Sequence, residues 1–206
     1  MKNLLAACLI SLFCAAGFGP VAAATLNVQV VDASGKPLRD AAVYAEPLSP
    51  PPPGHAREAE IEQKARKFMP IMTVVQTGAQ ISFPNNDTVR HHVYSFSPTK
   101  PFELKLYSGT PGSPILFDKP GTVVIGCNIH DQMVAYIQVV NTPYFAKSDD
   151  AGQARIADLP AGKYRLKAWH YQLPPSSPPV ENDIAVTTNE SSARMVVAAR
   201  TSAGAH

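Results

Sequence analysis

The chain has 206 residues, and its 18 Lys and Arg against 16 Asp and Glu give a formal net charge of only +2. This balance, with no run of Lys or Arg and no basic aromatic stripe, excludes the electrostatic footprint of a protein that binds nucleic acid. The length is sufficient for one large or two small domains with their own cores, and we expect two.

Residues 1–24 have the order of regions that is typical of a secretory signal peptide. Lys2 gives a positively charged start, residues 4–18 give an apolar stretch, and residues 22–24 give a small-residue cleavage site. We therefore expect a periplasmic protein whose mature chain begins near Thr25. The apolar stretch is too short for a transmembrane helix and no later segment is long enough, so no membrane span is predicted.

Short β-strands are predicted on one side of a proline-rich segment near the start of the mature chain. Residues 25–31 alternate apolar and polar side chains, and residues 42–45 follow after a turn rich in Gly and Pro. The four consecutive prolines at 50–53 favour an extended conformation. The charged segment 58–67 is expected to form a short helical turn, so residues 48–67 are predicted to be a linker.

The rest of the chain contains many strand patterns bounded by Gly, Asn, Asp or Pro. Seven short strands are predicted in its central part, at residues 72–75, 80–83, 92–96, 102–107, 115–117, 122–125 and 135–140. The pattern changes after residue 141, and further strands are predicted at residues 154–156, 164–169, 183–186 and 193–198. Short strands without a convincing long helix predict an all-β fold of antiparallel sandwiches, with residues 200–206 as a tail.

Possible metal ligands cluster at the ends of two of these predicted strands. Cys127, His130 and Met133 lie on one loop, and His91 and His92 lie at the start of another strand. Thiolate and thioether sulfur favour Cu(I) while imidazole binds both oxidation states, so this set of side chains suits copper. Two histidines, one cysteine and a weak axial methionine form the trigonal site of electron-transfer copper proteins.

Each of these residues also has a plainer interpretation. Cys127 is the only one of three cysteines outside the expected signal peptide, and a free cysteine is most often a buried core residue. Zinc also accepts sulfur and nitrogen, and a cysteine nucleophile with a histidine base would pair the same side chains. A catalytic zinc would have no carboxylate base apart from Asp131, and a nucleophile would leave Met133 unexplained, so copper is the favoured interpretation.

Motifs around the candidate ligands are similar to those of a known family. Residues 81–83, followed by residues 85–86 and then by His91, resemble the first-ligand region of the plastocyanin family of cupredoxins. The C-x2-H-x2-M spacing from Cys127 to Met133 resembles the ligand loop of amicyanin. Longer strings resemble exported cupredoxin-like proteins often labelled methylamine utilisation proteins, at residues 91–97, 117–121 and 142–145.

The cupredoxin resemblance implies a Greek-key β-sandwich over residues 68–141 and one type 1 copper ion. Four side chains would then bind the metal: His91, Cys127, His130 and Met133. In this register His92 takes the place beside the first ligand rather than the ligand position itself. Asn128 and Ile129 stand where the family usually has serine or threonine and proline, so a relative's reduction potential does not carry over to this chain.

The two flanks of this region have a separate resemblance. Residues 28–45 and 149–169 resemble the two halves of a carboxypeptidase regulatory-like, transthyretin-like β-sandwich. The resemblance implies a split sandwich over residues 25–47 and 142–199, with the cupredoxin inserted into it or packed beside it. Domains of this class usually serve as structural or interaction modules.

The expected function is that of an electron carrier rather than an enzyme. A periplasmic redox protein, such as a cytochrome c or a dehydrogenase, would be its partner. By the cupredoxin resemblance, His130 would be the more exposed ligand and electrons would leave there through a small apolar patch. The alternative is a copper-holding or interaction module without an electron-transfer role. A link to methylamine oxidation would follow from the family label alone.

Overall fold

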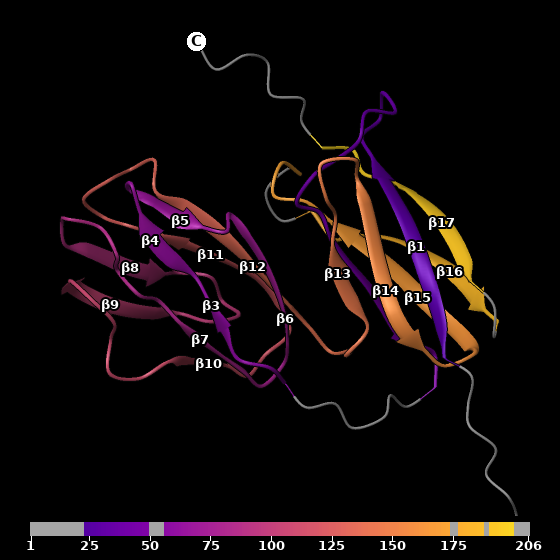
Figure 1. Cartoon of the computed structure of the whole chain (residues 1–206), viewed down its shortest axis with the longest axis horizontal. Helices are drawn as coiled ribbons and strands as arrows, with labels where there is room; N and C mark the ends of the chain where they lie inside the picture. The colour runs from indigo at the N-terminus through magenta and orange to yellow at the C-terminus, as the bar shows by residue number, and fades with distance from the viewer. Residues whose placement is uncertain (1–22, 50–55, 174–176, 188–189, 200–206) are drawn as a thin grey trace, which may run out of the picture.

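The computed structural model describes residues 23–49, 56–173, 177–187 and 190–199. The described residues form seventeen β-strands and no helix, which confirms the all-β fold (Figure 1). No helix that could cross a membrane is therefore found in this part of the chain. The expected signal peptide up to residue 22 and the expected tail lie outside the described residues.

Strands from the two ends of the chain build one β-sandwich, which we call the flanking sandwich. One of its sheets has the order β14-β1-β17, with bounds Gln153–Leu159, Ala24–Val31 and Ser191–Val196. The other has the order β13-β2-β15-β16, with bounds Phe145–Lys147, Ala42–Pro47, Gly162–Trp169 and Val180–Val186. Alternate residues of β1, Leu26, Val28 and Val30, are buried in the core between the sheets, as strand periodicity requires.

The intervening strands build a second body, which we call the central sandwich. A five-stranded sheet has the order β6-β12-β11-β8-β9, with bounds Met72–Gln76, Val134–Val140, Gly121–Gly126, His91–Ser95 and Phe102–Tyr107. A smaller sheet has the order β10-β7-β3, with bounds Ile115–Phe117, Ala79–Ser82 and Ala59–Glu60. The hairpin of β4 and β5 completes this body, with bounds Glu62–Lys64 and Lys67–Met69.

The helical turn expected over residues 58–67 is wrong, because this segment forms β3, β4 and the start of β5. Ile61 and Gln63 are fully buried, whereas Lys64 is exposed, so the segment has the two-residue period of a strand. The second of these buried residues, Gln63, is polar. The alternation of apolar and polar side chains that predicts a strand is therefore not visible in this segment. Ile61 packs into the same core as the strands of the larger sheet, although it lies within the expected linker.

The two sandwiches are in contact through the outer face of the five-stranded sheet. Met72 on β6 is fully buried in a small cluster with Ala42 and Trp169 of the flanking sandwich. Tyr136 on β12 packs against the same cluster and pairs with both Trp169 and Tyr171. Figure 1 shows β6 and β12 on the side of the central sandwich that faces β13. Part of this sheet face is therefore covered by the flanking sandwich.

Candidate metal centre

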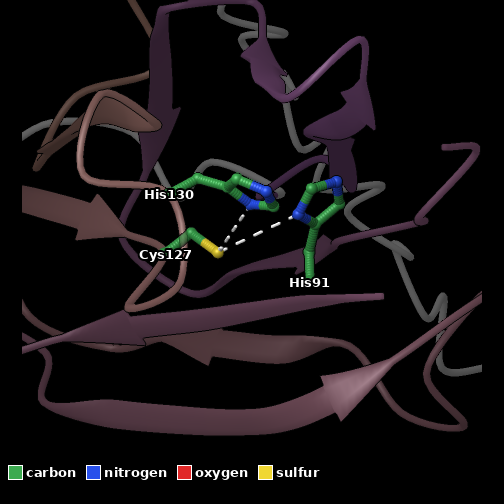
Figure 2. A group of neighbouring side chains, drawn as sticks. All are labelled: His91, Cys127 and His130. Carbon is green, nitrogen blue, oxygen red and sulfur yellow. Dashed lines mark hydrogen bonds between the residues drawn. The ribbon is translucent and has the colours of Figure 1, made fainter. Parts of the chain in front are cut away.

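Three of the predicted ligands meet at one end of the central sandwich. The Cys127 Sγ atom lies 3.9 Å from His91 Nδ1 and 3.9 Å from His130 Nδ1. The three candidate ligand atoms all lie within 4.8 Å of one another. Figure 2 shows the cysteine sulfur facing one nitrogen of each histidine ring. Among the described residues, no other group of three His, Cys, Asp or Glu side chains has this proximity.

Cys127 is placed by the strand that precedes it. Val123 and Ile125 of β11 point into the core, and the same two-residue period carries Cys127 to the buried side. The loop that follows is closed by two backbone hydrogen bonds. The Cys127 N–H donates to the Met133 carbonyl over 3.2 Å, and the Met133 N–H donates to the His130 carbonyl over 2.9 Å. The loop therefore has few ways to rearrange around the sulfur.

His91 is positioned by the loop between β7 and β8, which side-chain hydrogen bonds hold in place. The buried Asn85 donates from its side-chain amide to the carbonyl of Val89 over 2.9 Å and to that of Tyr107 over 2.8 Å. His91 then enters β8 opposite Tyr107 on β9, with its side chain fully buried. These contacts hold the imidazole at the edge of the core.

The structure separates the two neighbouring histidines. His91 lies beside the cysteine, whereas His92 is the next residue along β8 and its ring packs against Tyr94 at a centroid distance of 5.7 Å. His92 Nε2 lies 3.0 Å from a carboxylate oxygen of Glu103, without hydrogen-bond geometry. Only the first of the pair is therefore in reach of the sulfur.

A carboxylate on the far side of His91 defines the state of its ring. Asp87 Oδ2 lies 3.0 Å from His91 Nε2. The hydrogen bond with His91, followed by one from the Arg66 backbone N–H, lowers the pKa of Asp87 to about 2. An ionised carboxylate only accepts hydrogen bonds, so the Nε2–H of His91 donates to Asp87. In a neutral ring this tautomer leaves the lone pair of Nδ1 facing the sulfur.

The spacing of the three ligand atoms fits a bound metal better than a set of hydrogen bonds. Taking zinc as the reference ion, bonds of about 2.3 Å to sulfur and about 2.0–2.1 Å to nitrogen, set at a trigonal angle of about 120°, separate the two atoms by about 3.8 Å. The observed separations are both 3.9 Å. A single thiol has one proton and cannot donate it to two ring nitrogens at once. The donor set therefore has room for one ion between the sulfur and both rings.

Met133 and Tyr107 add to the surroundings of this group. Met133 is 1% exposed and belongs to the same core cluster as Cys127. Burial raises the pKa of Tyr107 to about 12, and the nearby Cys127 also contributes to this rise. The Tyr107 hydroxyl donates to the Phe83 carbonyl over 2.6 Å and accepts from the buried Gln63 amide. The cysteine thus lies in a buried part of the core.

Three neighbours of the site were not predicted from the sequence: Asp87, Tyr107 and Gln63. Asp87 lies four residues before His91, a spacing that is visible in the sequence but does not by itself indicate a contact. Tyr107 and Gln63 reach the site region through strand pairing and hairpin packing. No local pattern reveals contacts of that kind.

Several solved structures, cupredoxins among them, are similar to part of this chain. A purple cupredoxin from Nitrosopumilus maritimus is 19% identical over 40% of this chain and 99% of its own, with a TM-score of 0.36. Pseudoazurin from Hyphomicrobium denitrificans is 21% identical over 40% of this chain and 74% of its own, with a TM-score of 0.35.

An enzyme is among the similar structures as well. A copper-containing nitrite reductase from Thermus scotoductus is 24% identical over 40% of this chain and 22% of its own, with a TM-score of 0.37. No family model matches the chain, and no curated protein is significantly similar to it. A functional assignment for this chain therefore depends on the geometry of its own ligand group.

Proposed function

We propose that this chain is an exported, periplasmic blue-copper protein of the cupredoxin type that carries single electrons between redox partners. One copper ion would be held by His91, Cys127, His130 and Met133. When bound, copper would supply one-electron chemistry by alternating between its +1 and +2 states. The chain would then act as an electron carrier and not as an enzyme. A cytochrome c or a dehydrogenase of the periplasm is the proposed kind of partner.

One observation carries this proposal: the buried sulfur of Cys127 lies at equal distances of 3.9 Å from the Nδ1 atoms of two histidines. His91 lies on β8, and the other three proposed ligands lie on the hydrogen-bonded loop that follows β11, the neighbouring strand of the same sheet. These contacts hold the side chains in place independently of a metal. A site that keeps its geometry in both oxidation states needs little reorganisation when an electron moves.

The two histidines differ in their access to the surface. The His91 side chain is fully buried, whereas His130 is partly exposed and follows Ile129, which is 48% exposed. A partly exposed ligand ring beside an apolar side chain gives a partner a short path to the metal. We therefore place the contact with the redox partner at Ile129 and His130.

The flanking sandwich is proposed to be a transthyretin-like scaffold. Among the described residues, it contains no group of candidate metal ligands comparable to that of the central sandwich. Its role would be to support the five-stranded sheet through Met72 and Tyr136.

Stopped-flow mixing tests the proposal directly. The copper-loaded, oxidised protein is mixed with a reduced periplasmic cytochrome c, and the copper and haem absorbances are followed together. We expect both to change at the same rate, with one haem oxidised for each copper reduced. A stable copper band with no electron exchange would instead assign the chain to copper holding.

A further inference from the structure

Each ring nitrogen of the buried His91 faces a side chain of a different kind. His91 Nδ1 faces Cys127 Sγ at 3.9 Å, and His91 Nε2 lies 3.0 Å from Asp87 Oδ2. The histidine side chain is fully buried, and the Asp87 side chain is 13% exposed. The ring therefore cannot rotate about its Cβ–Cγ bond without losing the hydrogen bond to the carboxylate.

Asp87 is itself fixed by three backbone and side-chain contacts. Its Oδ2 accepts from the Arg66 N–H over 2.7 Å, and its Oδ1 accepts from the Thr88 N–H over 2.9 Å. Its own N–H donates to the side-chain oxygen of the buried Asn85 over 3.0 Å. These contacts define the orientation of the carboxylate independently of its hydrogen bond with His91.

The Arg66 contact comes from an unusual turn at the tip of the β4–β5 hairpin. Ala65 and Arg66 both have positive φ angles, of 51° and 56°. Side chains with a Cβ seldom adopt this backbone region, and such conformations persist where surrounding contacts require them. Here the turn directs one backbone N–H at the carboxylate of Asp87. The hairpin tip is therefore part of the support behind His91.

The neighbouring His92 provides a comparison that shows this arrangement to be specific to His91. His92 Nε2 also lies 3.0 Å from a carboxylate, that of Glu103, but without hydrogen-bond geometry. The Glu103 side chain is 54% exposed, so water competes for its oxygens. Of two adjacent histidines, the one that faces Cys127 has the aligned and fixed carboxylate.

We propose that Asp87 is a positioning residue for the metal ligand His91, which fixes the ring tautomer and strengthens its donation to copper. This inference rests on the proposed copper function. Outer carboxylates of this kind keep the proton on the distal nitrogen and raise the basicity of the nitrogen that binds the metal. A more basic ligand stabilises Cu(II) more than Cu(I), so Asp87 lowers the reduction potential of the centre.

The first test needs no copper. Nitrogen-15 NMR of the copper-free protein reports which ring nitrogen of His91 is protonated. We expect a single Nε2-protonated tautomer in the wild type and a mixture of the two tautomers in Asp87→Ala. An unchanged tautomer in this variant would overturn the positioning role, whether or not the wild type binds copper.

The second test uses the copper-loaded protein. In Asp87→Asn, which keeps the side-chain size and removes the charge, we expect Cu(II) affinity to fall about 10-fold to 100-fold. The reduction potential should rise by about 59 mV or more, which corresponds to a tenfold shift for one electron. The matched control is Glu103→Gln, which alters the carboxylate next to His92 and should change neither quantity. Equal values in Asp87→Asn and the wild type would overturn the inference.

The two tests separate failure of this inference from failure of the copper function. If the wild type binds no copper, the proposed function is wrong, and the NMR arm alone decides how Asp87 acts on the ring. If the wild type binds copper and Asp87→Asn is unchanged, the copper function stands and the role of Asp87 is rejected.

Discussion

The ring of Tyr136 on β12 stacks on the ring of Tyr171, with centroids 5.1 Å apart and ring planes 18° apart. Trp169 lies at a centroid distance of 6.0 Å from the same tyrosine. Tyr136 belongs to the sheet of the central sandwich, and its two partners belong to the end of β15 and the turn after it. Tyr136 thus connects the central sandwich to the flanking sandwich.

Replacing this side chain should weaken the contact between the two sandwiches. For Tyr136→Ala we expect the free energy of unfolding to fall by about 2 kcal/mol, because aromatic packing against two rings is lost. Urea denaturation followed by circular dichroism measures the change. Tyr94→Ala is the matched control, because Tyr94 is also partly buried on this sheet but its ring pairs with His92 and Phe96 of the central sandwich. Equal losses in the two variants would contradict a special role for Tyr136.

The stability of the protein should fall in mild acid because of His170. Burial lowers the pKa of His170 below its usual value of 6.5. Its Nε2–H donates to the Arg39 carbonyl over 2.9 Å, and its Nδ1 accepts from the Gln172 N–H, so the neutral ring is the one that fits. Below pH 6.5 the unfolded chain binds a proton that the folded chain resists, so the free energy of unfolding decreases as pH falls.

Denaturation curves of the copper-free protein at pH 7.5 and pH 5.5 test this expectation. The wild type should lose more stability between the two values than His170→Asn, which keeps a polar side chain without this titration. A variant with the same pH dependence as the wild type would show that His170 does not account for the effect.

Much of the fold could be predicted from the sequence, because most strands have one apolar and one polar face. Segments such as residues 25–31 and 102–107 were predicted close to their observed bounds. The strands β3, β4, β5 and β13 were missed. They have two or three residues each, too few for a period to be visible, and they exist because neighbouring strands offer hydrogen-bond partners.

The proximity of His91, Cys127 and His130 could be expected from the sequence, whereas the residues that support them could not. The spacing of Cys127, His130 and Met133 is a local property of one loop, and His91 stands at the start of a recognisable strand. The carboxylate of Asp87, in contrast, is fixed by a hydrogen bond from Arg66 at the hairpin tip, which is distant in the sequence. Contacts that depend on two distant segments are set by tertiary packing, which a single sequence does not display.

The apolar side chain beside His130 should control the rate of reaction with a partner. For Ile129→Lys we expect the second-order rate of electron exchange with a cytochrome c to fall about tenfold, because a charge is placed where apolar contact is needed. Stopped-flow spectroscopy measures this rate. Leu116→Lys introduces the same charge at a similarly exposed site, 46% exposed on β10, and should have little effect. If both variants slow the reaction equally, the contact surface is not at Ile129.

The turn before β14 should be sensitive to any side chain at Gly152. This glycine has a φ of 72°, and a Cβ there would lie 2.4 Å from the Val30 carbonyl oxygen. For Gly152→Ala we expect a loss of about 3 kcal/mol in the free energy of unfolding, from the unfavourable φ and the backbone clash. Gly112→Ala is the control, because nothing lies within 4 Å of a Cβ at that position. Matching stabilities of the two variants in urea would contradict this packing.

A copper(II) titration of the purified protein, followed by visible absorption, tests the central claim most directly. We expect one equivalent of copper to produce an intense thiolate-to-copper band, and we expect Cys127→Ser to abolish that band while the protein stays folded. A wild-type protein that remains colourless with one equivalent of copper, or a band that survives in Cys127→Ser, would contradict a copper centre at Cys127.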